Sequence, residues 1–373
     1  MSMPAVARAA QPAVAKAYEP GPSAKTGTVP VSPFRDFSQP WLDLNDKSVL
    51  VTGGTGSFGK HFLKTVVAQY KPRRVIIFSR DELKQSELAQ EFPQSTYPFI
   101  RYFIGDVRDR DRLDLALRDV DYVVHAAAMK QVPTAEYNPF ECIRTNVFGA
   151  ENLVYAALRR NVKKVVALST DKAANPINLY GASKLASDKI FVAANNLAGA
   201  DGTKFSVVRY GNVFGSRGSV VPFFRKLAAE GAESLPITDA RMTRFWITLT
   251  QGVNFVLSSM EMTRGGEIFV PKIPSTTVTD LATLLNPNLR QHVVGIRPGE
   301  KLHETMIPAD DAHSTVELDD RYVILASFAS ASREAYLNRG ARPVSEGFSY
   351  SSDSNPEMLD ARGLQTLLEL AYA

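Results

Sequence analysis

Residues 48–59, SVLVTGGTGSFG, join a short apolar run to a glycine-rich turn. The run is rich in β-branched residues, which favours a buried strand. Gly54, Gly56 and Gly59 fit a G-x-G-x-x-G spacing, and Gly53 offers an alternative first glycine. Glycine allows a tight turn and lets backbone N–H groups approach a pyrophosphate at the start of the following helix. A strand, a glycine turn and an amphipathic helix in this order predict a dinucleotide-binding unit.

Strands and helices alternate beyond this unit as well. This alternation is typical of an α/β fold with a doubly wound parallel sheet, the Rossmann architecture. From about residue 271 the alternation is lost, which predicts a smaller C-terminal substrate-binding domain. Further strands are expected at 74–79, 100–104, 122–125, 165–168 and 205–209. The nucleotide-binding domain is expected at 41–210, with 245–270 returning to it, and the sugar-nucleotide-binding part at 211–244 and 271–373.

Composition limits the possible functions. The chain has 373 residues and a net charge of +4, of which +2 falls within the first forty residues. A general nucleic-acid surface is therefore not indicated, and no apolar run approaches the roughly 20 residues that cross a bilayer. The single cysteine, Cys142, excludes an intrachain disulfide and fits a reducing cytosol, so we expect a cytoplasmic location. The histidines are scattered, and no metal site is expected.

Residues 1–40 are rich in alanine, proline and glycine and hold few bulky apolar side chains. Such a segment cannot bury a core of its own, so we expect it to be mobile, or ordered only against a partner subunit. It also lacks the compact apolar stretch of a secretory signal.

A second informative stretch, residues 165–184, reads VVALSTDKAANPINLYGASK. Residues 170–172, Thr-Asp-Lys, follow an expected strand at the sheet edge where open α/β folds bind ligands. Tyr180 and Lys184 are four residues apart and share one face of a helix. A phenol has a pKa of about 10, and a nearby ammonium lowers it. Tyr180 would then accept a proton from a substrate alcohol while a hydride leaves the same carbon.

The tyrosine–lysine pair alone does not establish catalysis. The spacing is common by chance, where it marks a helix with one aromatic residue and one solvated lysine. Two further features favour a catalytic pair in this chain: the preceding strand ends in Thr-Asp-Lys, and a glycine turn lies upstream.

The end of the second expected strand indicates the type of cofactor. NAD enzymes usually carry an acidic residue there for the ribose 2′-hydroxyl, whereas this chain has Ser79 and Arg80. A guanidinium suits a 2′-phosphate, so we expect NADP; the alternative is that Arg80 is only a surface charge. Asp106 either faces the adenine amino group or caps the next helix. The residues expected to bind the cofactor are Thr52, Gly53, Gly56, Ser57, Phe58, Gly59, Ser79, Arg80, Asp81, Lys84, Asp106, Val107, Ala126, Ala127, Lys130, Tyr180 and Lys184.

Several arginines beyond the glycine turn suggest a second anionic ligand. A diphosphate is the natural candidate, because guanidinium groups bind phosphate oxygens through charge-assisted hydrogen bonds. Surface ion pairs are the alternative for each arginine. The arginines are Arg217, Arg241, Arg244 and Arg297.

A long helix is expected at residues 139–159, with Asn146 one-third along it. An asparagine buried in a helix needs hydrogen-bond partners. Asn146 would hold a water or a kink near Lys184, or serve as a satisfied structural amide.

Seven segments of the chain resemble one family. They read TGGTGSFG, SRDELKQSEL, HAAAMKQVPTAEYNPFECIRTN, STDKAANPINLYGASK, YGNVFGSRGSVVPFF, RMTRFWIT and GIRPGEKLHE. Together they resemble the extended short-chain dehydrogenase/reductase family and, within it, the inverting UDP-N-acetylglucosamine 4,6-dehydratases of the pseudaminic acid pathway. The resemblance runs from about residue 45 to the C-terminus. Lys172 distinguishes this chain from dehydratases of the dTDP-glucose type, which carry Thr-Asp-Glu where this chain has Thr-Asp-Lys.

The resemblance implies roles for five residues. Tyr180 takes the 4-hydroxyl proton of the sugar while the C4 hydride passes to NADP⁺, and Thr170 hydrogen-bonds the 4-oxygen. A neutral Lys172 removes the C5 proton, and a protonated Asp171 donates to the departing 6-hydroxyl. Lys184 binds the nicotinamide ribose and lowers the pKa of Tyr180. The hydride returns to C6 and C5 is reprotonated from the opposite face, giving UDP-2-acetamido-2,6-dideoxy-β-L-arabino-hex-4-ulose.

This cycle makes a demand on protonation. A free lysine has a pKa of about 10.4, so we expect burial, Lys184 and the nicotinium charge to lower the pKa of Lys172. The pKa of Asp171 must rise for it to act as an acid.

The resemblance also implies UDP-N-acetylglucosamine as the substrate and a homo-oligomer, from dimer to hexamer. The alternatives are a retaining dehydratase or an epimerase acting on a UDP-sugar and, in another class, a non-catalytic NADP-sensing protein. Larger dehydratases that act on the same sugar nucleotide often have transmembrane helices, which this sequence lacks. The residues implied to bind the sugar nucleotide are Lys130, Asn146, Asn212, Val213, Arg217, Gly218, Ser219, Val220, Thr238, Met242, Arg244, Arg297 and Glu300.

Overall fold

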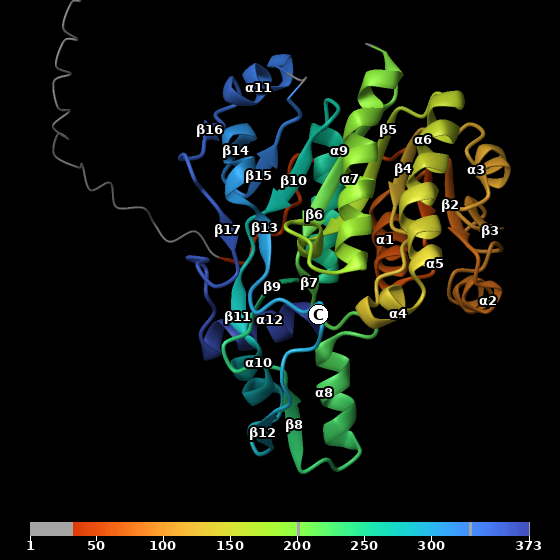
Figure 1. Ribbon diagram of the computed structural model, residues 1–373. Coiled ribbons are helices and arrows are strands. Elements are labelled where there is room, and N and C mark those ends of the chain that lie inside the picture. Colours follow the sequence, from red (N-terminus) through yellow and green to blue (C-terminus); the bar gives the residue numbers. More distant parts are fainter. Residues whose placement is uncertain (1–32, 200–201, 328–329, 373) are drawn as a thin grey trace, which may run out of the picture. The chain divides into compact units, whose positions relative to one another are not determined.

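The computed structural model describes residues 33–199, 202–327 and 330–372, so the mobility expected for residues 1–32 lies outside the described residues. Its main sheet has ten strands in the order β16-β14-β15-β10-β6-β5-β4-β1-β2-β3 (Figure 1). The strands from β10 to β3 in this order pair in parallel, and β15, β14 and β16 are joined to β10 and to one another by antiparallel pairings. The strands are β1 (Ser48–Thr52), β2 (Arg74–Ser79), β3 (Ile100–Ile104), β4 (Tyr122–His125), β5 (Lys164–Thr170), β6 (Lys204–Tyr210), β10 (Ile268–Pro271), β14 (Thr315–Glu317), β15 (Arg321–Ile324) and β16 (Arg342–Pro343).

Helices cover both faces of this sheet. The connections lead outwards from β1 in opposite directions, so right-handed crossovers place helices on opposite faces. Helix α1 packs with α9, while α6 packs with α3 and α7 (Figure 1). The predicted doubly wound parallel sheet is confirmed. The helices around it are α1 (Ser57–Gln69), α2 (Glu82–Glu91), α3 (Arg110–Ala116), α4 (Val132–Tyr137), α5 (Pro139–Ile143), α6 (Gly149–Arg159), α7 (Leu179–Ala198), α9 (Leu249–Met262) and α11 (Ser330–Leu337).

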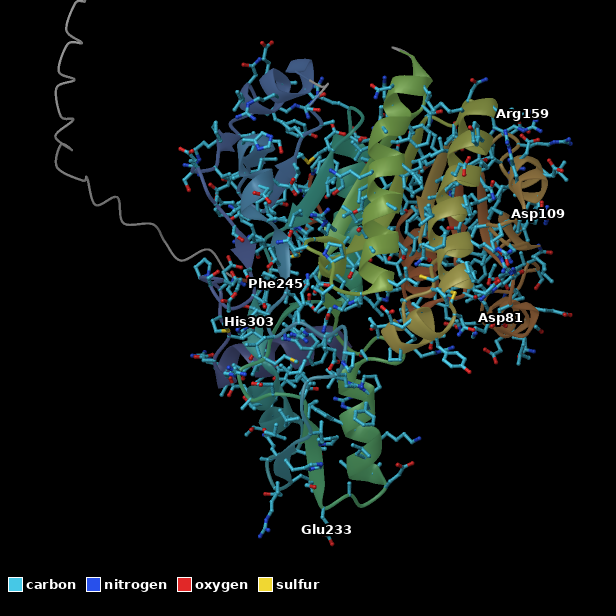
Figure 2. The ribbon with its side chains drawn as sticks, in the orientation of Figure 1. Asp81, Asp109, Arg159, Glu233, Phe245 and His303 are labelled. Atoms are coloured by element: carbon cyan, nitrogen blue, oxygen red, sulfur yellow. The ribbon has the colours of Figure 1, made fainter. Side chains whose placement is uncertain are left out.

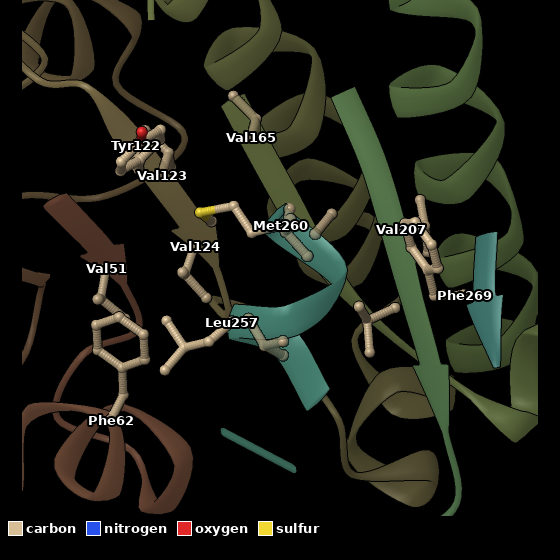
Figure 3. Close-up of a cluster of buried hydrophobic side chains, with 14 of the residues drawn as sticks. Val51, Phe62, Tyr122, Val123, Val124, Val165, Val207, Leu257, Met260 and Phe269 are labelled. Atoms are coloured by element: carbon tan, nitrogen blue, oxygen red, sulfur yellow. The ribbon is translucent and has the colours of Figure 1, made fainter. Parts of the chain in front are cut away.

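The main apolar core lies on both faces of the sheet, and Figure 3 shows the part of it between the sheet and helices α1 and α9. Val51 and Val124 come from neighbouring strands and are fully buried, as β-branched residues are in parallel strands covered on both faces. Phe62 of α1 and Leu257 and Met260 of α9 pack against them. This core fixes the central strands whose carboxyl ends carry the candidate site.

A second, smaller part is built from short elements with apolar clusters of their own. One cluster contains Phe214, Val221 and Trp246, and another contains Phe224 and Leu235. That this part binds the substrate stays a prediction. Its elements are β7 (Asn212–Val213), α8 (Val220–Ala229), β8 (Ser234–Ile237), β9 (Thr243–Ile247), β11 (Ser275–Thr277), α10 (Val278–Leu285), β12 (Arg290–Val293) and α12 (Ala361–Tyr372); β13 (Thr305–Ile307) pairs with β17 (Tyr350–Ser351), and η3 (Ala309–Ser314) is a 3-10 turn.

The division of the chain differs from the expected one. We expected all of 271–373 in the substrate-binding part, but β14, β15 and β16 extend the main sheet. Strand β15 pairs antiparallel with β10, with Ile324 opposite Ile268. Antiparallel strands need no crossover helix, so these strands lack the alternating pattern that revealed the parallel ones.

Residues 33–40 pack onto the rest of the protein, although we expected mobility throughout the first forty residues. Arg35 forms an ion pair with Glu357 at 2.6 Å. Phe37 is 2% exposed and lies edge-on against Phe255 of α9, with the ring centroids 5.1 Å apart. The prediction is wrong for this segment, because a composition averaged over forty residues hides two anchoring side chains near its end.

We expect Phe37→Ala to lower the free energy of unfolding by about 3 kcal/mol, because truncating a buried phenylalanine removes apolar contacts and leaves a cavity. Denaturant unfolding followed by circular dichroism would measure the change. Ser38→Ala is the control, since Ser38 is small and half-buried and hydrogen-bonds the nearby Asp36. Equal stability of the two variants would contradict the packing of residues 33–40.

Candidate active site

Thr170, Asp171 and Lys172 end β5 and begin a 3-10 turn, η2 (Asp171–Ala173). Thr170 Oγ1 accepts the Lys172 N–H at 3.4 Å and donates to Asp171 Oδ1 at 2.9 Å. Lys172 Nζ donates to the same Oδ1 at 3.0 Å. Asp171 is buried, and among the described residues nothing donates to its Oδ2. The three predicted residues therefore form one hydrogen-bonded cluster at the carboxyl end of β5.

Helix α7 brings Tyr180 to this cluster. A Cβ at Gly181 would lie 2.2 Å from the Lys172 carbonyl oxygen, so only glycine allows α7 to pack this closely on η2. Tyr180 is buried, and burial raises its pKa to about 12. The charge of Lys172 and a hydrogen bond with Thr170 act in the opposite direction and favour the phenolate.

Lys184 lies one helical turn beyond Tyr180 and is buried. Its Nζ donates to the Leu168 carbonyl of β5 at 2.7 Å. Burial lowers the pKa of Lys184, and the carboxylate of Asp188 opposes that effect. We expected Lys184 to lower the pKa of Tyr180, but the cation with the strongest effect there is Lys172.

Glu304 is a site residue that was not among the expected ones, although it ends the segment GIRPGEKLHE quoted above. It is 1% exposed, and its Oε1 lies 3.1 Å from Lys172 Nζ. Arg244 and Lys301 also lie near its carboxylate, each at 3.9 Å. Glu304 is far from Lys172 along the chain, so the contact arises only from the fold.

Two carboxylates set the charge of Lys172. Burial alone favours the neutral amine, but Asp171 and Glu304 outweigh it and raise the pKa of Lys172 above its ordinary value. The expectation that its surroundings lower this pKa does not hold here, because it left out the effects of the Asp171 and Glu304 carboxylates. Lys172 and Asp171 are an ion pair in this structure.

The glycine turn has the close packing that a dinucleotide site needs. Gly53 has a φ of +64°, and a Cβ there would lie 2.9 Å from the Ala127 backbone. A Cβ at Gly59 would lie 2.4 Å from Gly54, so α1 packs directly on the turn. Gly56 is the N-cap of α1 and provides no side-chain hydrogen bond, which leaves N–H groups of the first turn available to an anion. These residues fit the pyrophosphate of a dinucleotide.

The remaining expected cofactor residues line the ends of the neighbouring strands. Thr52 Oγ1 accepts the N–H groups of Ala126 and Ala127 at 3.2 Å each, which holds these small residues beside the turn. Ser79 Oγ lies 2.9 Å from Thr55 Oγ1. The aromatic ring of Phe58 stacks on Phe62, and Val107 is buried.

Charged residues near the end of β2 pair with one another. Asp81, labelled in Figure 2, caps α2 by accepting the Lys84 N–H at 3.0 Å and forms an ion pair with the Lys84 ammonium. Arg80 Nη1 lies 3.5 Å from Asp106, which also pairs with Arg108 at 2.7 Å. The capping alternative for Asp106 is wrong, because Asp109 caps α3.

Part of the expected substrate set lies against the glycine turn. The Arg217 N–H donates to Ser57 Oγ at 3.3 Å, and Lys130 Nζ donates to the Arg217 carbonyl at 3.0 Å. Gly218 has a φ of +74°, Ser219 is the N-cap of α8, and Val220 begins that helix. The structure therefore brings Lys130 and residues 217–220 together beside the cofactor loop.

The other expected substrate residues are dispersed. Met242 is buried in an apolar cluster, and the buried Arg244 donates to the carbonyls of Thr243, Lys301 and Leu302. The Arg297 side chain is 67% exposed and pairs with Glu300 at 3.0 Å. Arg241 pairs with Asp239 on the surface at 2.9 Å, which favours the ion-pair alternative for this arginine. Asn212 and Val213 form β7, which pairs with β9, and Thr238 follows β8.

Asn146 lies in a π-helical turn, η1 (Arg144–Phe148), that interrupts the expected long helix between α5 and α6. Its Oδ1 accepts the Met129 N–H at 2.8 Å, and its Nδ2 donates to the Met129 carbonyl at 3.0 Å and to Ser183 Oγ at 2.9 Å. The amide is hydrogen-bonded through both of its polar atoms and lies in a widened turn, so the structure fits both the structural amide and the kink among the expected roles. Widened turns of this kind often lie at functional sites, and this one ties the loop after β4 to α7.

Comparison with known proteins places the chain in a family. It matches the polysaccharide biosynthesis protein family over residues 49–326 and belongs to that family. A relative from Campylobacter jejuni subsp. jejuni serotype O:2, named UDP-N-acetylglucosamine 4,6-dehydratase (inverting), is 60% identical over 317 residues, which are 84% of this chain and 94% of the relative.

Solved structures show the same architecture. Pen from Bacillus thuringiensis is 37% identical, with a TM-score of 0.81 over 88% of this chain and 99% of its own. A double mutant of DesIV, the dTDP-glucose 4,6-dehydratase of Streptomyces venezuelae, was solved with NAD and DAU bound. It is 27% identical, with a TM-score of 0.60 over 68% of this chain and 86% of its own. The resemblance to extended short-chain dehydrogenases is confirmed. Of the helices in the described part of the chain, none combines the length and the apolar character that crossing a membrane requires.

We expect Asn146→Ala to lower the free energy of unfolding by about 1–3 kcal/mol, because it leaves the partly buried backbone N–H and carbonyl of Met129 without this partner and removes one hydrogen bond of Ser183. Chemical denaturation would measure the loss. Asn338→Ala, which truncates an exposed asparagine at the end of α11, serves as the control. A loss no greater than that of the control would show that Asn146 does not hold this turn.

Proposed function

We propose that the protein is an inverting UDP-N-acetylglucosamine 4,6-dehydratase, a hydro-lyase that forms UDP-2-acetamido-2,6-dideoxy-β-L-arabino-hex-4-ulose. The observation that carries the proposal is the buried cluster of Thr170, Asp171 and Lys172 against Tyr180, in a chain that is 60% identical to a protein of that name. The cluster supplies an amine, a carboxyl and a phenol, which are the acid and base groups that dehydration beside a new ketone requires.

NADP is the cofactor that we propose. When bound, it would accept the hydride from C4 of the sugar and return it at C6. Gly53, Gly56 and the uncapped start of α1 would hold its pyrophosphate. The side chain of Arg80 is 59% exposed and would bind a 2′-phosphate. Asp106 would keep a partner in Arg108 if Arg80 turned to the phosphate.

Tyr180 would take the proton of the 4-hydroxyl. With a pKa of about 12 the phenol is protonated at neutral pH, so Tyr180 needs a further positive charge in the loaded site before it acts as a base. Lys172 and Thr170 already favour its phenolate. Thr170 Oγ1, which donates to Asp171 here, would turn toward the 4-oxygen of the sugar.

The ion pair of Lys172 and Asp171 is one proton transfer from the states that dehydration needs. The amine must be neutral to take the C5 proton, and the carboxyl must be protonated to donate to the leaving 6-hydroxyl. Lys172 Nζ and Asp171 Oδ1 are 3.0 Å apart, so one proton moving along this hydrogen bond produces both states. A substrate that excludes water favours the neutral pair, because burial penalises separated charges. Elimination then returns both groups to the ion pair.

For the diphosphate of the substrate we propose Lys130, Arg217 and Arg297. Lys130 Nζ donates to the Arg217 carbonyl at 3.0 Å, and the Arg297 side chain is exposed, so their cationic groups can reach phosphate oxygens. The assignment of 211–244 and 271–373 to substrate binding is proposed with the exception of β14 to β16, which belong to the main sheet. A homo-oligomer of two to six chains and a cytoplasmic location stay predictions.

Incubation with UDP-N-acetylglucosamine tests the function directly. We expect loss of one water from the sugar nucleotide by mass spectrometry and an inverted C5 by NMR. Lys172→Ala should slow exchange of the C5 proton with deuterated solvent by about 10²–10⁴-fold, the usual contribution of a general base. Lys226→Ala, an exposed lysine of α8 paired with Glu230, is the control. Retention of the C5 configuration would contradict the inverting activity. Full exchange of the C5 proton in Lys172→Ala would contradict the assignment of Lys172 as the base.

Arg80→Ala tests the cofactor. Removing a charge-assisted contact of about 1.5–3 kcal/mol should weaken NADPH binding by about tenfold to a hundredfold and leave NADH binding nearly unchanged. Fluorescence titration with each reduced cofactor measures both affinities. Arg159→Ala, at the exposed end of α6 (Figure 2), is a matched control. An equal change for the two cofactors would rule out a contact with the 2′-phosphate.

A further inference from the structure

The backbone of Glu304 is held firmly beside the cluster at the end of β5. Its N–H donates to Ser352 Oγ at 3.0 Å, and its carbonyl accepts the Ser352 N–H at 2.8 Å. Glu304 directly precedes β13, whose residues contact the η2 turn. The side chain is buried at 1% exposure, with Oε1 3.1 Å from Lys172 Nζ. A carboxylate in such a place must be paired, and its nearest cation is Lys172.

The two carboxylates on Lys172 have different parts in the proposed reaction. Asp171 gains and loses a proton during the cycle, so its negative charge disappears just before Lys172 acts as the base. Glu304 has no such duty and keeps its charge. Glu304 is therefore the carboxylate that remains beside Lys172 when the C5 proton arrives.

On the basis of the function proposed above, we propose that Glu304 is a positioning residue that holds the Lys172 amine in place and stabilises the ammonium formed at C5 proton abstraction. In that step the C5–H bond breaks and an N–H bond forms on Lys172. The electron pair forms the C5–C6 double bond, and the 6-hydroxyl leaves as water with the proton of Asp171. Glu304 neither gains nor loses a proton.

A purely structural explanation would have Glu304 neutralise Arg244 and Lys301. Both lie farther away, at 3.9 Å, and both have other partners. Arg244 donates to three backbone carbonyls, and Lys301 Nζ donates to the Ala174 carbonyl at 2.6 Å. Lys172 has the shorter contact with Glu304, so the lysine is the group that depends on this carboxylate most.

The negative charge of Glu304 predicts the direction in which its removal changes the pKa of Lys172. Removing it lowers the pKa of Lys172, since Glu304 is one of the two carboxylates that raise that pKa. The working Lys172–Asp171 pair shares one proton, and activity is lost when that proton dissociates at high pH. Without Glu304 this loss should begin at a lower pH. The titratable and charged groups facing Lys172 are Asp171, Tyr180, Arg244, Lys301 and Glu304.

The experiment compares the full-length wild type with Glu304→Gln and Glu304→Asp. Kinetics with UDP-N-acetylglucosamine across pH give kcat and KM, and NMR gives C5 exchange. We expect Glu304→Gln to lower kcat about tenfold, less than loss of the base itself, with KM little changed. Its alkaline limb should move down by about one to three pH units, as loss of a neighbouring charge predicts. Glu304→Asp keeps the charge and should leave the limb in place while lowering kcat.

Glu317→Gln is the matched control, because it also removes a carboxylate from a lysine, Lys272 at 2.7 Å, but in the main sheet. An alkaline limb of Glu304→Gln that coincides with the wild type overturns the inference. If Glu304→Gln does not fold, Glu304→Asp decides: a wild-type kcat overturns the positioning role, and a lowered kcat with an unmoved limb supports it. A wild type that releases no water from the substrate overturns the proposed function instead.

Discussion

A buried ammonium held between two carboxylates is the interaction on which the site depends. Lys172 lies 3.0 Å from Asp171 and 3.1 Å from Glu304, in a part of the protein where an unpaired charge would be costly. One carboxylate comes from the end of β5, and the other comes from the segment before β13. The end of β5 and the segment before β13 must therefore both be in place before this lysine has its partners.

Two glycines, which have no Cβ, set the distances between the backbone elements around that interaction. Gly181 lets α7 approach η2 and so brings Tyr180 to Thr170, while Gly59 lets α1 pack on the glycine turn. In both places the neighbouring atoms would lie within 2.4 Å of a Cβ. Close backbone packing thus determines where the phenol and the helix N-terminus lie, and the reactive groups follow from it.

Signals confined to one segment were predictable from the sequence, and contacts between distant segments were not. The glycine turn and the Tyr180–Lys184 pair are spacings within one element, and the alternation of strands and helices predicted the parallel sheet. Glu304 reaches Lys172 only through the fold, and β14 to β16 join the sheet without a crossover helix. The sequence around Asn146 has a continuous helical pattern and gave no sign of the π-helical turn, because the turn arises from hydrogen bonds to Met129 and Ser183.

The path of the chain has a practical consequence for engineering. It leaves the main sheet for the smaller part after β6, returns for α9 and β10, leaves again at β11 and returns for β14 and β15. Neither part is a contiguous stretch of the gene, so neither can be produced alone by simple truncation. Exchanging substrate preference between relatives would require transplanting several separate inserts together, with Glu304 among them.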